Sequence, residues 1–253
     1  MIAAVGKCGG CGGRELLCVY NVQSGVCVNT IKSYEFFPGL LRNVKGVAFS
    51  DAGYMFVTSS RNQILVFDDE RNFVVSHGAY GSDRAQYDNA TALAFYTSMN
   101  SSGMPQGNLV VCDAGNKRVQ VIEAETGEQV LEFDLRIAHP TSVAVGTNGP
   151  IAVVDRENKR VQVFDLSGKH QMTLGDGGHL SSPYAVAIGV GGEFLVSDKA
   201  ANRIQIFHSN GVFWRTIVES GAGCGSPRGI AVDTTGRIFA ATRSSDFSLR
   251  MFY

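Results

Sequence analysis

The sequence lacks the long apolar run that a membrane-spanning helix requires, since no stretch approaches about 20 consecutive apolar residues. The apolar stretch at residues 1–5 is too short for a secretory signal. An excess of one charge is also lacking, because 22 Lys and Arg face 23 Asp and Glu for a net charge of -1. These absences argue against a membrane protein, an exported protein and a generally basic nucleic-acid binder, so we expect a cytoplasmic protein.

Cysteine is too sparse for a disulfide framework, with six residues in a chain of 253. Cys8 and Cys11 have half of a zinc site's spacing, but no second pair of ligands at metal-binding spacing follows. No Ser-His-Asp order with a nucleophile elbow is visible, and the five histidines fall in different loops. We therefore expect reduced thiols, no metal, no cofactor and no enzymatic activity.

Helical periodicity is nearly absent, and short Val/Ile/Phe runs separated by turn residues fill the chain. One phrase recurs five times, of which 142–145 and 185–188 are examples, and its alanines are spaced 46, 50, 43 and 44 residues apart. A second phrase follows each copy, as at 161–164, and a third lies between them, as at 151–155. Four short strands in each repeat of roughly 44 residues are typical of a propeller blade.

The repeats predict an all-β fold, a six-bladed β-propeller of four-stranded antiparallel blades. We name the strands of a blade a to d, from the inside outward. Strands b, c and d are expected in the first repeat, and strands a, b and c in the last. A five-bladed ring is the alternative, and it would leave the first c–d hairpin unpaired. The single expected domain, 1–253, has blades at approximately 1–43 (partial), 44–90, 91–140, 141–183, 184–227 and 228–253 (partial).

The repeats resemble NHL repeats along essentially the whole chain. The most diagnostic stretch is 140–164, which contains Asp155, Asn158 and Arg160, and a similar stretch returns at 183–207. Among NHL propellers, the pattern is most similar to the C-terminal domains of TRIM-NHL proteins. This resemblance implies post-transcriptional regulation, in which the domain binds short single-stranded RNA motifs and represses the bound messages. It also implies a parent protein with a RING ubiquitin-ligase module, which this chain does not contain.

A recurring Asp-Arg pair is expected to be structural, because the Asp ends strand b and the Arg opens strand c in each repeat. Such a clamp is worth about 0–1 kcal/mol where it is exposed. The repeated asparagines are expected to adopt a turn conformation that Asn tolerates. Thr58 stands in place of the Asp in the first complete repeat, and 96–107 is a longer a–b loop in the second. The pairs are Asp113/Arg118, Asp155/Arg160 and Asp198/Arg203, and the asparagines are Asn116, Asn158 and Asn202.

Two loop positions repeat on the side that carries the d–a and b–c connections. Six of these eleven positions are Lys or Arg, one is Tyr and none is acidic, where the chain-wide frequency predicts about one basic residue. Loops on a rigid scaffold concentrate binding residues. Arg61 and His139 lie in the same loops. The predicted RNA-binding residues are Lys7, Lys45, Arg61, His139, Arg156, Tyr184, Lys199, Arg228 and Arg243.

Cations around an aromatic ring suit single-stranded RNA, because charges bind phosphates and a flat ring stacks on a base. Tyr184 is expected to stack, and Arg228 and Arg243 to contact phosphate or a guanine edge. Double-stranded DNA is not expected as a partner, since no helix or strand is offered to a groove. A membrane is not expected either, since the chain lacks a long apolar run. The alternatives are a merely solvated loop surface and a platform that recruits protein partners, on either face, for a ubiquitin ligase. A propeller lyase or hydrolase is disfavoured.

Overall fold

The computed structural model describes residues 2–7, 15–20, 27–32, 44–134, 136–147, 149–218, 226–243 and 247–252. Cys8 and Cys11 lie outside the described residues. The chain forms two compact units, Met1–Glu132 and Phe133–Tyr253.

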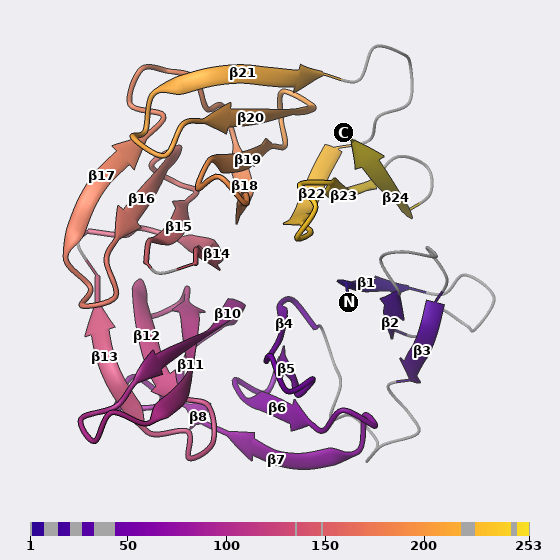
Figure 1. The fold of residues 1–253 in the computed structure, drawn as a ribbon, viewed down its shortest axis with the longest axis vertical. Helices are drawn as coiled ribbons and strands as arrows, with labels where there is room; N and C mark the ends of the chain where they lie inside the picture. The colour runs from indigo at the N-terminus through magenta and orange to yellow at the C-terminus, as the bar shows by residue number, and fades with distance from the viewer. Residues whose placement is uncertain are drawn as a thin grey trace. The chain divides into compact units, whose positions relative to one another are not determined.

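The first unit contains antiparallel sheets whose strands follow one another in chain order (Figure 1). A short parallel pair is inserted between the second and third of them, formed by β8 (Ala79–Tyr80) and β9 (Gln86–Tyr87). The three larger sheets are β1 (Ile2–Lys7), β2 (Glu15–Tyr20) and β3 (Cys27–Lys32); β4 (Val47–Phe49), β5 (Met55–Thr58), β6 (Ile64–Phe67) and β7 (Phe73–His77); and β10 (Ala90–Met99), β11 (Pro105–Asp113), β12 (Arg118–Glu123) and β13 (Gln129–Phe133), which ends at the unit boundary.

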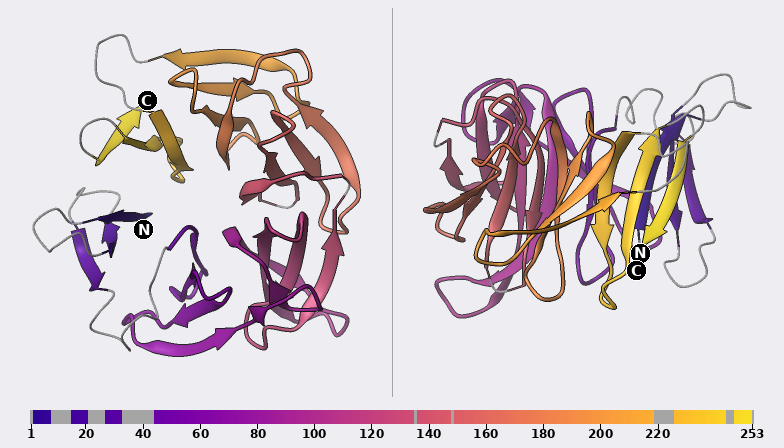
Figure 2. Two further views of the ribbon diagram at one scale, coloured as in Figure 1. Left: turned by 180° about the vertical axis from the view of Figure 1, so that it is seen from behind. Right: turned by 90° about the horizontal axis from the view of Figure 1, so that it is seen from above.

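The second unit repeats the same antiparallel arrangement (Figure 1). Figure 2 shows the three strands of its last sheet side by side. The sheets are β14 (Pro140–Val145), β15 (Ile151–Asp155), β16 (Arg160–Phe164) and β17 (His170–Leu174); β18 (Pro183–Ile188), β19 (Phe194–Asp198), β20 (Arg203–Phe207) and β21 (Phe213–Val218); and β22 (Ser226–Val232), β23 (Ile238–Arg243) and β24 (Phe247–Phe252).

The all-β class and the four-stranded antiparallel blade are confirmed. Within the described residues, four sheets have four strands, and the first and last larger sheets have three strands each. Their strands are enough for five complete blades, so the predicted count of six is wrong. The repeated sequence phrases identified each sheet, but they could not show how many of the sheets form complete blades, because the first and the last sheet each lack one strand.

The middle strands of each blade carry the core. Every residue of β15 and of β19 is buried, which explains their nearly continuous apolar sequence, because both faces of these strands are covered. In the second unit, Val154, Val186 and Phe194 belong to one apolar cluster. The outer strand β17 is largely exposed at its start. Each blade therefore presents a rigid interior whose ends carry the loops.

The recurring aspartates are buried, not exposed. Asp113, Asp155 and Asp198 each have 0% of their surface exposed, and each accepts a hydrogen bond from the Arg Nε that opens strand c, at 2.9 to 3.2 Å. Each carboxylate also accepts from the backbone of the connection before strand a. This geometry confirms the structural role. The free energy of about 0–1 kcal/mol expected for an exposed pair is too small, since a buried carboxylate depends on all of its donors.

The Asp155 carboxylate shows the full arrangement. Ala138 N and His139 N donate to its Oδ1 at 3.0 and 3.3 Å, and Asn158 Nδ2 and Arg160 Nε donate to its Oδ2 at 2.7 and 3.1 Å. One buried side chain thus joins the d–a connection to the b–c turn. The position of both loops follows from it.

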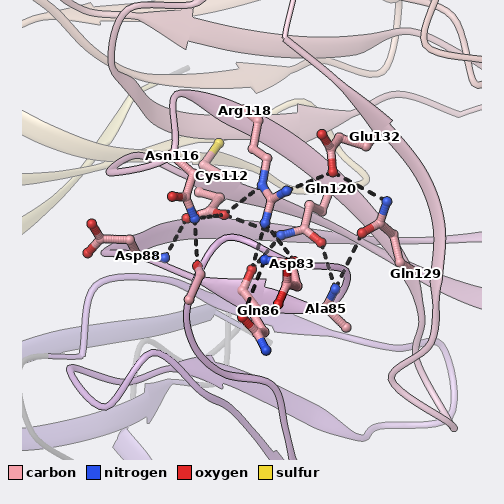
Figure 3. A network of polar contacts seen from close by, with 12 residues as sticks. Asp83, Ala85, Gln86, Asp88, Cys112, Asn116, Arg118, Gln120, Gln129 and Glu132 are labelled. Atoms are coloured by element: carbon pink, nitrogen blue, oxygen red, sulfur yellow. Dashed lines mark hydrogen bonds and ion pairs between the residues drawn. The ribbon is translucent and has the colours of Figure 1, made fainter.

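The equivalent network in the first unit, around Asp113, is extended by Arg118 (Figure 3). Its guanidinium pairs with Asp113 at 2.9 Å and Glu132 at 2.8 Å, and it donates to the carbonyl oxygens of Asp83 and Gln86 at 2.9 and 3.0 Å. The inserted segment 78–89 is therefore anchored to the b–c turn.

The conformation predicted for the asparagines is wrong at two of three positions. Asn202 has a positive φ of 51°, whereas in the two other turns the residue with positive φ is the next one, Lys117 (56°) and Lys159 (53°). The side chains of Asn116 and Asn158 instead donate to the buried aspartates at 2.8 and 2.7 Å. Their amides stabilise the carboxylate, because a charged acceptor strengthens such bonds.

Two local sequence interpretations also change. Thr58 Oγ1 accepts from Gly46 N at 2.8 Å, the same bond that Ser197 Oγ accepts from Ala185 N at 2.9 Å, so Thr58 is equivalent to Ser197 and not to the aspartate. The expected loop 96–107 is mostly hairpin, because β10 and β11 stay paired from Tyr96 opposite Asn108 to Met99 opposite Pro105.

The buried carboxylate predicts a large stability effect. We expect Asp155→Ala to lower the free energy of unfolding by about 3–5 kcal/mol, because it leaves its buried charged and polar partners without an acceptor. The matched control is Asp165→Ala, in a turn where Asp165 accepts from Ser167 N and Lys169 N at 2.9 and 3.0 Å near the surface. Its loss should be much smaller, because water can replace the donors around a carboxylate near the surface. Urea unfolding followed by circular dichroism measures both, and equal losses would contradict the argument.

Candidate nucleic-acid interface

A β-bulge recurs at the start of the inner strands of the second unit. In β18, Pro183 pairs with Asp198 and Ala185 with Ser197, so Tyr184 is the extra residue. Thr141 in β14 and Arg228 in β22 are skipped in the same way. A bulge turns its extra side chain out of the regular alternation, and bulges are frequent beside functional sites. These are the positions that the sequence indicated before strand a.

The loops after strand b lie at the same end of each blade. Arg156 N donates to His139 O at 3.1 Å, and Lys199 N donates to Ser182 O at 2.9 Å. Each cationic residue directly follows the buried aspartate of its strand. Its backbone is therefore bonded to the connection that leads into the bulge.

Three cationic side chains of the second unit meet at one aromatic ring. Arg156 Cζ lies 5.6 Å from the centroid of the Tyr184 ring, Lys199 Nζ 5.4 Å and Arg228 Cζ 5.6 Å. Cations at these distances are attracted by the negative face of the ring. They come from the b–c turn of one sheet, the b–c turn of the next and the bulge of a third. We name these four residues the Tyr184 cluster.

The Tyr184 cluster is accessible and electropositive. All four residues are half-buried. Within the part of the chain that the structure describes, no ion pair joins Arg156 or Arg228 to a carboxylate, and the buried Nε of Arg228 has no hydrogen-bond partner. The nearby carboxylates Asp155 and Asp198 are occupied by their own arginines and backbone groups. The cluster thus has a local charge that an anion would neutralise.

His139 and Arg243 belong to the same end of their blades. His139 is half-buried and precedes β14. Arg243 ends β23 opposite Ser226, in the register position that follows the other b strands, and its side chain is not described. Their backbones fit the predicted face, while contact with the Tyr184 cluster stays a prediction.

The predicted residues of the first unit belong to its first and second sheets. Lys45 is exposed and its ammonium donates to Asn89 Oδ1, while Asn89 N donates to Asn62 Oδ1 at 2.7 Å. Partial desolvation lowers the pKa of the Lys45 ammonium. The exposed Arg61 precedes Asn62 in the same turn. Lys7 ends β1 opposite Glu15, and its side chain is not described.

A second aromatic cluster, around Trp214, was not predicted from the sequence. Trp214 is about half exposed, its ring stacks on His208 at a centroid distance of 4.9 Å, and Arg215 lies 4.8 Å from it. Trp214 is the bulge residue of β21, the outer strand of its sheet, because Phe213 and Arg215 pair with consecutive residues of β20. The same bulge repeats in other outer strands at Val74 and Gln171, and both residues are exposed, so this position faces solvent; only the strand pairing reveals it.

The described residues contain no cluster of metal-binding side chains. Within those ranges, no group of three or more His, Cys, Asp or Glu side chains is placed to hold a metal ion. Burial raises the pKa of the Cys112 thiol, which disfavours the thiolate that would bind a metal or react. No helix in the described segments has both the length and the apolar character needed to cross a bilayer.

Comparisons with known proteins agree with this architecture. The NHL repeat family matches residues 138–164. A crystal structure of a protein of unknown function from Bacteroides caccae is similar over 96% of this chain and 84% of that chain, at 13% identity and a TM-score of 0.65. A streptogramin B lyase structure is similar over 90% of this chain and 68% of that chain, at 12% identity and a TM-score of 0.64.

At these identities the structural likenesses show the fold alone. A comparison with curated proteins found no match, so the narrower resemblance to TRIM-NHL proteins stays a prediction. The chain therefore has an all-β propeller fold of four-stranded antiparallel blades, with one segment, 138–164, that is similar to the NHL repeat, and such a scaffold is suited to binding through its loops.

Proposed function

We propose that this chain is a single-stranded RNA-binding NHL domain of the TRIM-NHL kind and that the Tyr184 cluster is the centre of its binding face. The observation that carries the proposal is the convergence of Arg156, Lys199 and Arg228 on the Tyr184 ring. A merely solvated loop surface does not require three like charges to gather at one ring. Their mutual repulsion is relieved when an anion binds between them.

Single-stranded RNA fits this arrangement better than a duplex. The cluster offers half-buried side chains at strand ends and no helix or ribbon that could enter a groove. Single strands are bound by cations that contact the backbone and by aromatic rings that stack on bases. Tyr184 has two roles in this proposal, since its ring holds the cations in place and offers an apolar surface to a base. His139 and Arg243 would extend the face within the second unit, and RNA binding by Lys7, Lys45 and Arg61 of the first unit stays a separate prediction.

Salt dependence tests the phosphate contacts. We expect the Arg156→Gln/Lys199→Gln variant to bind an RNA ligand selected from a random pool more weakly than the unmodified protein. The slope of log affinity against log salt should fall by about 0.7 for each phosphate that the variant no longer neutralises. The matched control is Arg237→Gln, which removes a cation paired with Asp233 at the opposite end of the β22–β23 hairpin. Fluorescence anisotropy at several salt concentrations measures both, and an unchanged slope in the double variant would refute the site.

The aromatic ring supplies a separate test. We expect Tyr184→Leu to weaken RNA binding by about 1–3 kcal/mol, the range measured for one stacked base. Tyr184→Phe should retain most of the affinity, since it keeps the ring. Trp214→Leu is the control for loss of an exposed aromatic residue next to an arginine. If the two leucine variants bind equally well, Tyr184 is no stacking residue; filter binding gives the comparison.

The alternative function is a platform for protein partners. The exposed Met99 and Met104, at the tip of the β10–β11 hairpin, favour it, because neighbouring exposed apolar groups mark interaction sites. A selection from randomised RNA distinguishes the two functions. If no motif is enriched while a stable protein partner is purified, the platform replaces RNA binding as the function.

A further inference from the structure

The Tyr184 cluster is compact, whereas the phosphates of an RNA strand are spread along it. Every cationic centre lies within 5.6 Å of one ring centroid, so any two of them are at most about 11 Å apart. All three belong to the second unit. A site that tracked a strand would distribute its cations along a groove. Here they surround a single point.

Three cations at one point match an anion with more than one charge. A phosphodiester inside a strand carries one negative charge. A phosphomonoester carries about -1.5 to -2 near neutral pH and has three strong acceptor oxygens. The two arginines can each present a planar fork of donors to such a group, and Lys199 adds a point charge.

Arg228 supplies an independent observation. Its Nε is buried and has no hydrogen-bond partner, although most buried polar groups in proteins have one. Its own backbone oxygen accepts from Ser197 Oγ at 3.4 Å, which fixes the bulge from which the side chain extends. A donor held next to two further cations and left unsatisfied is suited to an oxygen of a ligand.

We propose that the Tyr184 cluster binds the terminal phosphomonoester of an RNA strand, with the terminal base against the Tyr184 ring. This inference rests on the proposed function and specifies which part of the RNA occupies the site. Arg156 and Arg228 bind the phosphate oxygens through their guanidinium forks, and Lys199 neutralises the remaining charge. The terminus is selected because only an end offers both the additional charge and the additional oxygen.

The test uses one short RNA of fixed sequence in three forms: with a 5′-phosphate, with a 3′-phosphate and with hydroxyls at both ends. We expect one of the two phosphorylated forms to bind about 10-fold more tightly than the hydroxyl form, the size of one or two charge-assisted hydrogen bonds. The form that binds tightly identifies the end that is recognised. Inorganic phosphate should compete with that form and not with the hydroxyl form.

Variants show whether the Tyr184 cluster is responsible. Arg156→Gln, at a half-buried turn position, should reduce the preference for the phosphorylated end to less than about 3-fold. Arg228→Gln should do the same, and circular dichroism establishes that each variant is folded. Arg237→Gln should retain the full preference, because its guanidinium is paired with Asp233 at 2.7 Å at the other end of the hairpin.

The outcomes separate this inference from the proposed function. Equal affinity for all three RNA forms overturns the terminal-phosphate inference and leaves single-strand binding in place. No binding of any RNA form overturns both. A preference that persists in Arg156→Gln and Arg228→Gln also overturns the inference, because the phosphate is then bound elsewhere. A phosphoserine peptide that binds more tightly than every RNA form would assign the cluster to a protein ligand instead.

Discussion

A buried carboxylate at the end of strand b is the constraint on which the candidate site depends. In three blades it binds the arginine that opens strand c and also the backbone of the connection before strand a. Because Arg156 and Lys199 directly follow Asp155 and Asp198, the buried carboxylates fix the backbone positions from which these two cationic side chains extend. The stability of the blade and the geometry of its binding loops therefore share one interaction.

The bulge at the start of strand a is the second element of this arrangement. It removes Tyr184 and Arg228 from the regular alternation of their strands, so that neither side chain is needed to fill the core. Three neighbouring sheets of the second unit then each contribute at least one residue to the Tyr184 cluster. The apolar residues of each repeat form the core. The bulge residue and the residue after the aspartate lie outside the core, so binding residues can occupy these positions without loss of packing.

The strands and the blade could be predicted from the sequence because the same pattern recurs several times, so that an ambiguous copy can be interpreted from the others. The alanine phrases and the apolar runs repeat in register, which marked the strands and the four-stranded blade. The sequence could indicate only that these residues share a face, since the approach of Arg156 and Arg228 to the Tyr184 ring depends on how three sheets pack. The turn conformations of Asn116 and Asn158 were mistaken because the residue with positive φ is the fourth after the buried aspartate in each turn, and only Asn202 occupies that position. The number of complete blades depends on strands that the repeated phrases cannot supply.

Ultraviolet crosslinking of a bound single-stranded RNA, with the modified peptides identified by mass spectrometry, shows directly whether RNA lies at the Tyr184 cluster. We expect crosslinks in the second unit to concentrate on the peptides that contain Tyr184, Arg156 and Arg228. Crosslinks confined in that unit to the outer strand β21 around Trp214, with none at Tyr184, would contradict RNA binding at the Tyr184 cluster.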